Sequence, residues 1–497
     1  MMLKSRRSLF ATKSVEQLVS HSEGEHRMKR VLGAADLVAL GIGAIIGSGI
    51  FVITGAAAAA HAGPAVVISF LIAGAVAAFA ALCYSELAAM IPVSGSAYTY
   101  TYATMGELVA WIIGWDLILE YLIGASAVSV GWSGYATTFF MRVTGVELPV
   151  QWIHAPLSWD PGTGSIQWTG NYVNLPAVAI TLFMTAVLIV GVRESARLNI
   201  GIVFVKIAVL LAFIVAAAPF VRPDNWQPFV PENHGTFGAF GPSGVFQAAS
   251  VVFFAYIGFD AVSTAAQECR NPKRDLPIGI IVSLAVSTVL YIAVALVLTG
   301  VVSYTTLKVP DPIDVGVAAT GYEWLQVVVD IGAIAGLSSV LLVTLLGQPR
   351  IFLAMARDGL LPPWAARIHP RYRTPYVTTA ITGSVCAVVG GLLPIEILSE
   401  LTSIGTLFAF SLVSLGVMIL RRKQPDLPRP FMVPFGPYVI PLLGAGSSAM
   451  LMYTATTETL IRLFVWMAIG LVIYFAYGRR HSRLDDNVTP TNLTSRL

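Results

Sequence analysis

The sequence predicts an all-α polytopic membrane protein with twelve membrane-spanning helices. Of its 497 residues, 56% are hydrophobic and only 11% are charged, and the mean hydropathy is +0.76. Soluble domains carry roughly 25% charged residues, so a water-soluble fold could not hide this much apolar surface. Apolar runs of about 20 residues, the length that a helix needs to cross a hydrocarbon core, recur along the whole chain.

Polar breaks between these apolar runs set the limits of the predicted spans. The spans cover residues 36–60, 64–90, 105–130, 175–192, 198–220, 243–266, 276–302, 322–348, 376–393, 397–420, 437–457 and 460–478. They divide the chain into an N-terminal arm (1–35), a first half of five helices (36–220), a second half of five helices (221–420), a closing pair (421–480) and a tail (481–497). The segment 131–174 is rich in Trp, Pro, Gly and Asp, and we expect an ordered outer loop there that can hold a short re-entrant helix.

The distribution of lysine and arginine predicts the orientation. With the N-terminus in the cytoplasm, 25 of the 30 basic residues fall on the inner side and four on the outer side. Inner loops of membrane proteins carry such an excess, so we expect a multi-pass protein of the cell membrane with both termini cytoplasmic. The polar first 30 residues contain no signal-peptide core, and the arm is predicted to be solvated.

The remaining composition excludes several classes of function. The three cysteines, Cys83, Cys269 and Cys386, lack the spacing of a disulfide framework or a metal site and are interpreted as small buried residues. The spans contain no histidine pair, HExxH, GxSxG or clustered acid dyad, and the chain has no P-loop. We therefore expect no metal, no cofactor, no nucleic-acid partner, no enzymatic activity and no ATP-driven step.

Glycine interrupts the first and the sixth span. Gly41, Gly43, Gly47 and Gly49 lie within nine residues of the first span, and each weakens a helix by about 1 kcal/mol relative to alanine. Gly258 lies in the sixth span, five spans later and in the opposite orientation. Close helix packing through small residues is the alternative interpretation.

The two interruptions together favour a binding site. Glycine breaks in corresponding places of two inverted halves are the best sequence indication of a transporter's site. An unwound turn leaves amides at the start of a half-helix, which suit a carboxylate, and free carbonyls, which suit an ammonium. Because the zwitterionic backbone of an amino acid presents both groups, the sequence favours a carrier of amino acids.

Four separated motifs match a known family. They are GIGAIIGSGIF at 41–51, the connection 86–100 with IPVSGSAY, the segment 253–264 followed by ECRNPKRDLP at 268–277, and GQPR at 347–350 with ARDGLLP at 356–362. Over about residues 30 to 480 the chain resembles the amino acid–polyamine–organocation (APC) superfamily, in its cationic amino acid transporter branch. The resemblance implies the LeuT-type fold, a 5+5 inverted repeat with two peripheral helices, and twelve spans favour a bacterial-type permease.

The resemblance also implies roles for individual residues. Gly47, Ser48 and Gly49 would hold the substrate carboxylate through backbone amides and the serine hydroxyl. The carbonyls that would take the ammonium are those of Ile45, Phe254, Ala255 and Ile257. Phe254 or Phe259 would act as a gate.

Lys206 lies in the fifth span, about eight residues from its inner end, which is roughly 12 Å deep at ~1.5 Å per residue. An isolated lysine at the bilayer centre costs about 2.5–3.5 kcal/mol, so Lys206 must find partners in the bundle or lose its proton. It is either a tether to the carbonyls of the broken first span or a group that changes its proton or partners during the cycle. In sodium-coupled relatives a cation bridges spans one, five and eight, and the resemblance suggests that Lys206 replaces it, which favours proton coupling.

Asp116 and Glu120 lie four residues apart in the third span, which places them on one face of a helix. Glu120 is the deeper of the two and is predicted to face the site as a protonatable, proton-coupling group, with a fixed hydrogen-bonding role as the alternative. Asp330, Asp260 and Glu86 lie nearer span ends or inner loops and are assigned structural roles.

Thr344 is a polar residue in the eighth span, a helix that is expected to border the pocket. Its hydroxyl either bonds back to the carbonyl four residues earlier or faces the substrate. In the second case its modest size leaves room for a longer substrate side chain.

These observations predict a secondary active transporter that imports L-amino acids, with proton symport as the energy source. The alternative within the same fold is an obligate amino-acid exchanger. A membrane-embedded enzyme is disfavoured by the missing catalytic motifs, and a sensor by the short tails. The side chain of the substrate (cationic, small neutral or broad), the oligomeric state and a small accessory membrane subunit stay open.

Overall fold

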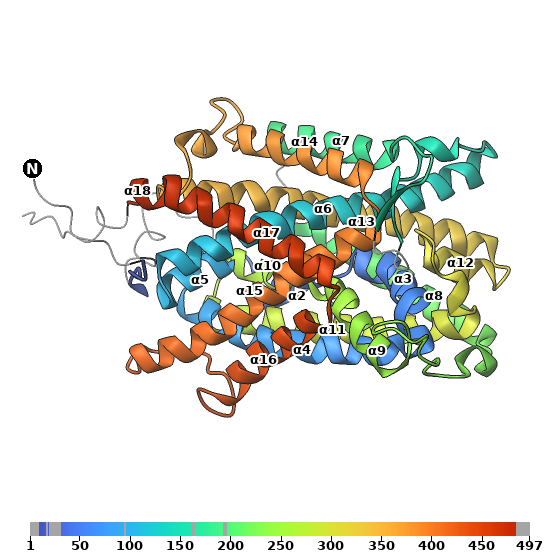
Figure 1. Ribbon diagram of the computed structural model, residues 1–497, viewed down its shortest axis with the longest axis horizontal. Helices are drawn as coiled ribbons and strands as arrows, with labels where there is room; N and C mark the ends of the chain where they lie inside the picture. Colours follow the sequence, from blue (N-terminus) through green and yellow to red (C-terminus); the bar gives the residue numbers. More distant parts are fainter. Residues whose placement is uncertain are drawn as a thin grey trace, which may run out of the picture.

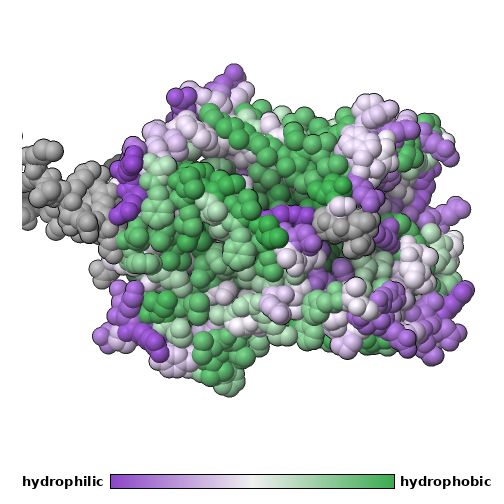
Figure 2. Space-filling view, viewed as in Figure 1, coloured by the Kyte–Doolittle hydropathy of each residue, from purple (hydrophilic) through white to green (hydrophobic). Residues whose placement is uncertain are grey.

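The computed structural model is built from long α-helices that run along its longest axis (Figure 1). It describes residues 9–15, 18, 31–93, 96–160, 165–191 and 196–483. Apolar residues cover much of the middle of the face in Figure 2, apart from a smaller hydrophilic patch, and hydrophilic residues gather at its two ends. A membrane-spanning bundle needs such a surface, because its middle faces lipid and its ends face water.

The first half of the chain begins with a broken helix. Its pieces are α2 (Ala34–Ile45), the π-helical turn η1 (Gly49–Ile53), α3 (Thr54–Ala57) and a second π-helical turn, η2 (Ala58–Ala62). The helices that follow are α4 (Val66–Met90), α5 (Ser96–Thr104), α6 (Glu107–Thr144), α7 (Leu175–Val190) and α8 (Ala196–Ala217). The first predicted span of this half corresponds to the broken helix, and the other four overlap α4, α6, α7 and α8.

The second half also begins with a broken helix. Its pieces are α9 (Gly241–Val252), the 3₁₀ turn η7 (Phe253–Tyr256) and α10 (Ala261–Thr264). The helices that follow are α11 (Pro272–Val301), the short α12 (Pro312–Ala318), α13 (Glu323–Arg357), α14 (Tyr376–Leu392) and α15 (Ile395–Lys423). The chain closes with α16 (Val439–Thr454), α17 (Thr457–Ile473), the π-helical turn η11 (Tyr474–Gly478) and α18 (Arg479–His481).

Eight helical segments in the described residues are long and apolar enough to cross a membrane. The first of them, Ala34–Met90, contains two of the predicted spans. Three shorter apolar helices, α7, α14 and α16, cover three further predicted spans. The chain is therefore a polytopic helical membrane protein.

The predicted end of the third span is wrong. Helix α6 continues through residues 131–144, which we expected in a loop, and it ends at Gly145, whose φ is +69°. Polar residues in this stretch, such as Ser133 and Tyr135, are buried inside the molecule, so their polarity does not signal a loop. In the described part of the connection that follows, β1 (Leu157–Asp160) and β2 (Ser165–Trp168) form an antiparallel hairpin, and no re-entrant helix is present.

Both ends of the described chain lie at one end of the molecule, which we call the terminal end (Figure 1). Leu9 and Ala11 accept hydrogen bonds from the amides of Leu108 and Glu107 at the start of α6, at 3.0 and 3.1 Å. Helix α6 therefore starts at the terminal end, and its residue numbers rise toward the opposite end.

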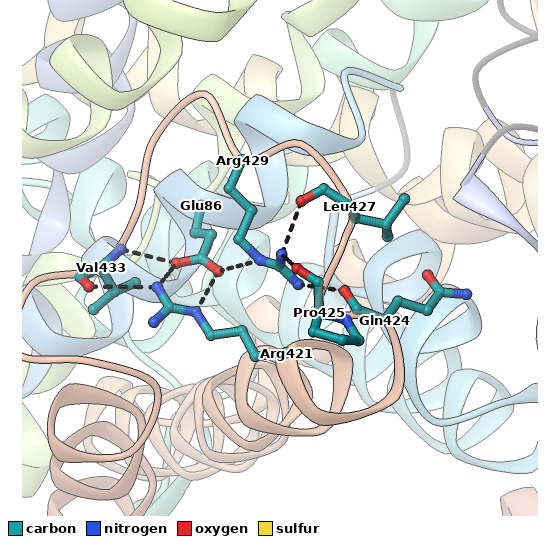
Figure 3. Close-up of polar contacts among 7 residues, drawn as sticks. All are labelled: Glu86, Arg421, Gln424, Pro425, Leu427, Arg429 and Val433. Atoms are coloured by element: carbon teal, nitrogen blue, oxygen red, sulfur yellow. Dashed lines mark hydrogen bonds and ion pairs between the residues drawn. The ribbon is translucent and has the colours of Figure 1, made fainter.

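A buried ion cluster joins α4 to α15 (Figure 3). Glu86, near the end of α4, accepts a hydrogen bond from Nε of Arg421 at 2.8 Å and lies 3.6 Å from Nε of Arg429. Its second oxygen accepts from the amide of Val433 at 2.8 Å. Because the Glu86 side chain is only 1% exposed, this cluster fixes the loop between α15 and α16 against α4.

A second ion cluster joins three helices at the opposite end. Arg142, near the end of α6, pairs with Asp314 of α12 at 2.7 Å and with Asp330 of α13. The hydroxyl of Thr138 donates to Asp311, just before α12, at 2.6 Å. Burial raises the pKa of Asp314, and the Arg142 guanidinium acts in the other direction. These contacts hold the short helix α12 over α6 and α13.

Candidate functional site

The two broken helices meet in the interior of the molecule. Turn η1 contacts η7, and the pieces of both helices pack against α4, α11 and α15. Helix α13, which packs closely against α6, also contacts α2. Both interruptions that the glycines predict are therefore present, and they lie side by side.

The backbones of the two breaks touch each other because glycine, which has no side chain, stands at the points of contact. Helix α2 ends at Ile45, and the helix resumes at Gly49. A Cβ added to Gly49 would lie 2.2 Å from the Cα of Ala255. In the other break Gly258 has a φ of +117°, which favours glycine, and an added Cβ would lie 2.8 Å from the carbonyl of Ala44. Only glycine at positions 49 and 258 allows the two backbones to come this close.

One hydroxyl ties the two breaks together. Tyr291 of α11 is fully buried, and its hydroxyl lies 2.8 Å from the carbonyl oxygen of Ile45 and 2.9 Å from that of Ala255. Because a phenol has a single proton to donate, the two carbonyls share it. These are two of the four carbonyls that were predicted to take a substrate ammonium.

A cavity opens beside the two breaks. It is lined from the first break by Ala44, Ile45, Gly47, Ser48 and Gly49, from the sixth span by Phe254, Ile257, Gly258, Asp260 and Ala261, and from α6, α13 and α15 by Glu120, Tyr121, Gly124, Val128, Val340, Val343, Thr344 and Thr402. Seven of the eight predicted substrate-binding residues are in this lining, and Ala255 is outside it. Of the two predicted gate residues, Phe254 lines the cavity, whereas Phe259 is fully buried against the rings of Tyr84 and Phe410.

The carboxyl groups of Glu120 and Asp260 and the hydroxyl of Ser48 reach the cavity. Ser48 is 1% exposed, and its Oγ has no hydrogen-bond partner among the described residues. Glu120 and Asp260 line the cavity from different helices, and Asp260 accepts a hydrogen bond from Ser96 at 3.3 Å. The first residues of a helix have amides without intrahelical partners, so the start of η1 adds donors next to Ser48.

Lys206 contacts the first break but is not among the residues that line the cavity. Its side chain is fully buried, and its Nζ donates to the carbonyls of Gly43 and Ile46 at 2.8 and 2.9 Å. A Cβ added to Gly336 of α13 would lie 3.1 Å from its Cε. The lysine thus joins the fifth span to the broken first span beside the eighth, which is the tether that the sequence allowed. A change of proton during the cycle stays a prediction.

Thr344 combines both of its predicted arrangements. It lines the cavity, and its hydroxyl donates to the carbonyl of Val340, four residues earlier, at 2.8 Å. Its hydroxyl proton is therefore donated to the backbone of its own helix.

Sequence reasoning missed the aliphatic wall of the cavity, Asp260 and Tyr291. The wall consists of Gly124, Val128, Val340 and Val343, in α6 and α13. Valine and glycine are common on lipid-facing and cavity-facing surfaces alike, so their identity carries no signal. Asp260 was assigned a structural role, although its place two residues after Gly258 could have indicated the site.

A multi-pass helical bundle with a cavity between two broken helices is typical of membrane transporters. The amino acid permease family model matches residues 32–475. The chain belongs to this family, as the resemblance to the APC superfamily predicted, and it is a transporter rather than an enzyme.

Several relatives support this assignment. The branched-chain amino acid permease BcaP of Bacillus subtilis is 49% identical over 96% of this chain and 99% of its own length. The methylthioribose transporter of the same organism is 45% identical over 96% of this chain and 99% of its own length. The vacuolar cationic amino acid transporter 4 of Arabidopsis thaliana is 37% identical over 84% of this chain and 68% of its own length.

Proposed function

We propose that this chain is a secondary active transporter that imports L-amino acids by alternating access, coupled to protons. The observation that carries the proposal is the cavity between two helix breaks that touch each other. Such breaks offer amides and carbonyls at one place, and a zwitterion needs both. Family membership supports amino acids as the substrate class.

The proposed architecture has twelve membrane crossings. The three shorter apolar helices have 16 or 17 residues, or about 25 Å at ~1.5 Å per residue, which local thinning of the bilayer would accommodate. The spans of 36–220 and 221–420 would form the two inverted repeats of a LeuT-type fold, since a broken helix begins each. The pair in 421–480 would be peripheral, and most of the arm (1–35) and of the tail (481–497) lies outside the described residues.

The protein would lie in the cell membrane. Its terminal end would face the cytoplasm. The excess of basic residues on that side supports this orientation. The opposite end, with the Arg142 cluster, would face outward.

The substrate backbone would bind across the two breaks. Ser48 and the amides of Gly47 and Gly49 would hold the carboxylate, since the start of a half-helix favours an anion. The carbonyl of Ile257 would take the ammonium most directly. Tyr291 already donates to those of Ile45 and Ala255, and the amide of Ile257 donates to that of Phe254 at 3.3 Å.

We expect an aliphatic substrate side chain. Val128, Val340 and Val343 line the cavity beyond the breaks, and burying methyl groups against them is favourable. The 49% identity to a permease named for branched-chain amino acids supports this assignment. A cationic side chain, attracted by Glu120 and Asp260, and methylthioribose, named for the 45% identical relative, are the competing substrates.

Uptake of radiolabelled L-leucine into proteoliposomes tests the proposal. With an inward proton gradient we expect accumulation, which a protonophore abolishes. Uptake that needs internal amino acid and ignores the gradient would instead indicate an obligate exchanger. Competition by the twenty amino acids and by methylthioribose then identifies the preferred substrate; competition by methylthioribose alone would contradict amino-acid transport.

A further inference from the structure

Asp116 of α6 is a buried carboxyl that the transport scheme above does not use. It is fully buried, and neither of its carboxyl oxygens has a hydrogen-bond partner among the described residues. Glu107, another buried acid of α6, differs because Tyr102 and Tyr474 donate to its two oxygens at 3.0 and 2.9 Å. Asp116 therefore lacks the polar contacts that explain a structural acid.

In the part of the chain that the structure describes, no lysine, arginine or histidine acts on Asp116 as a counter-charge. Helix α15 presents Gly405, where an added Cβ would lie 3.1 Å from the Oδ1 atom of Asp116. Glu120, the next acid on the same face of α6, adds a second negative charge rather than a compensating one. A lone carboxylate in such surroundings would cost several kcal/mol, which an apolar residue would avoid. Packing and stability thus give no reason for an acid at this position.

Glu120 connects Asp116 to the cavity. Glu120 lines the cavity, and its Oε2 has no hydrogen-bond partner among the described residues. The two acids share one face of α6 and are about 6 Å apart along the helix axis. Since α6 starts at the terminal end, Asp116 lies on the terminal-end side of Glu120. Asp260 also lines the cavity, and its negative charge would repel that of an ionised Glu120.

We propose that Asp116 is a second proton-carrying group of the transport cycle, one helical turn behind Glu120 on the path to the terminal end. This inference rests on the proposed proton-coupled transport. In the state described here Asp116 would be a neutral acid, because it is fully buried and neither of its oxygens accepts a hydrogen bond from a described residue. When the terminal end opens, it would release its proton to the cytoplasm.

The step between the two acids transfers one proton and nothing else. The O–H bond of the Glu120 carboxyl breaks, and an O–H bond forms on the Asp116 carboxylate. Glu120 is left as a carboxylate, which takes its next proton from water that reaches the cavity when the opposite end opens. Asp116 would store the proton while substrate and Glu120 share the cavity.

The variants Asp116→Asn and Glu107→Gln test the proposal in proteoliposomes. Wild-type protein first establishes that an inward proton gradient drives accumulation of L-leucine; if it does not, the proposed function itself fails. In Asp116→Asn we expect gradient-driven accumulation to fall by about tenfold or more, because an amide cannot take up or release the proton. Exchange of internal for external leucine should change by less than about twofold, since the substrate site is intact. Glu107→Gln is the matched control, with unchanged proton coupling.

Infrared difference spectroscopy gives a readout that does not depend on transport. We expect the carbonyl stretch of a protonated carboxyl to be missing from the spectrum of detergent-purified Asp116→Asn. If gradient-driven accumulation survives in Asp116→Asn while wild-type uptake is proton-driven, the proposal is wrong. It is equally wrong if exchange and net uptake fall together, or if no protonated-carboxyl band is lost.

Discussion

Gly49 is the residue on which the geometry of the site depends most. A Cβ at this position would lie 2.2 Å from the Cα of Ala255 and 2.4 Å from its Cβ, and the backbone of Ala255 cannot turn aside as a flexible side chain could. We expect Gly49→Ala to force the two breaks apart and weaken substrate binding about tenfold, or about 1.4 kcal/mol, within the range of overpacking. The substrate-induced rise in the melting temperature measures the affinity.

The matched control for this prediction is Gly446→Ala. A Cβ at Gly446 meets nothing within 4 Å, so this variant should bind like the wild type. Equal affinities of Gly49→Ala and wild type would show that the contact between the breaks does not shape the site.

Lys206 supports a second prediction at the residue scale. In Lys206→Met the carbonyls of Gly43 and Ile46 lose their donor, while the length of the side chain is nearly kept. If the ammonium belongs to the coupling mechanism, net uptake in Lys206→Met should lose its dependence on external pH. Uptake at a series of external pH values, with the membrane potential held constant, measures this. A pH dependence equal to that of the wild type would leave the lysine as a tether only.

The helices themselves were largely predictable from the sequence, and the walls of the cavity were not. Span positions follow from apolar length, because lipid imposes the same requirement on every crossing helix. Gly47 and Gly258 revealed the breaks because glycine weakens a helix wherever it stands. The part of α6 after residue 130 was missed because Ser133 and Tyr135 are buried against neighbouring helices, and a linear reading of polarity cannot distinguish that environment from water.

The cluster around Glu86 gives a prediction at the scale of helices. Glu86→Gln would leave Arg421 and Arg429 buried without their acid, and breaking such a pair typically costs 3–5 kcal/mol. We expect the free energy of unfolding to fall by about 3 kcal/mol, because the loop after α15 would lose its anchor on α4. Thermal unfolding in detergent measures the change, and Glu147→Gln, at an exposed position, is the control. Equal melting temperatures of Glu86→Gln and wild type would contradict the role of the cluster.

Whether the cavity is reached from the opposite end is a property of the whole molecule. Arg142 joins α6 to Asp314 and Asp330, so we expect Arg142→Gln to loosen α12 and favour a state open at that end. A cysteine placed in the cavity by Val128→Cys should then react about tenfold faster with a membrane-impermeant thiol reagent, which corresponds to a shift of about 1.4 kcal/mol between the two states.

The three native cysteines are buried in the structure, so the introduced thiol should dominate the signal. Arg222→Gln, which removes an exposed basic residue outside the cluster, is the control. Unchanged labelling rates in Arg142→Gln would mean that other contacts keep the opposite end closed.

The contact between the two breaks also bears on how new transporters could arise from this scaffold. At positions 49 and 258 backbone meets backbone, so almost any substitution there would disturb the whole site at once. At Val128, Val340 and Val343 only side chains border the cavity, and an exchange of one for another would reshape the pocket while the helices stay where they are. Substrate selectivity could therefore change by single substitutions while the arrangement of the helices stays the same. This separation of a fixed backbone contact from a variable cavity wall suits a family in which relatives with 49% and 45% identity to this chain are named for different substrates.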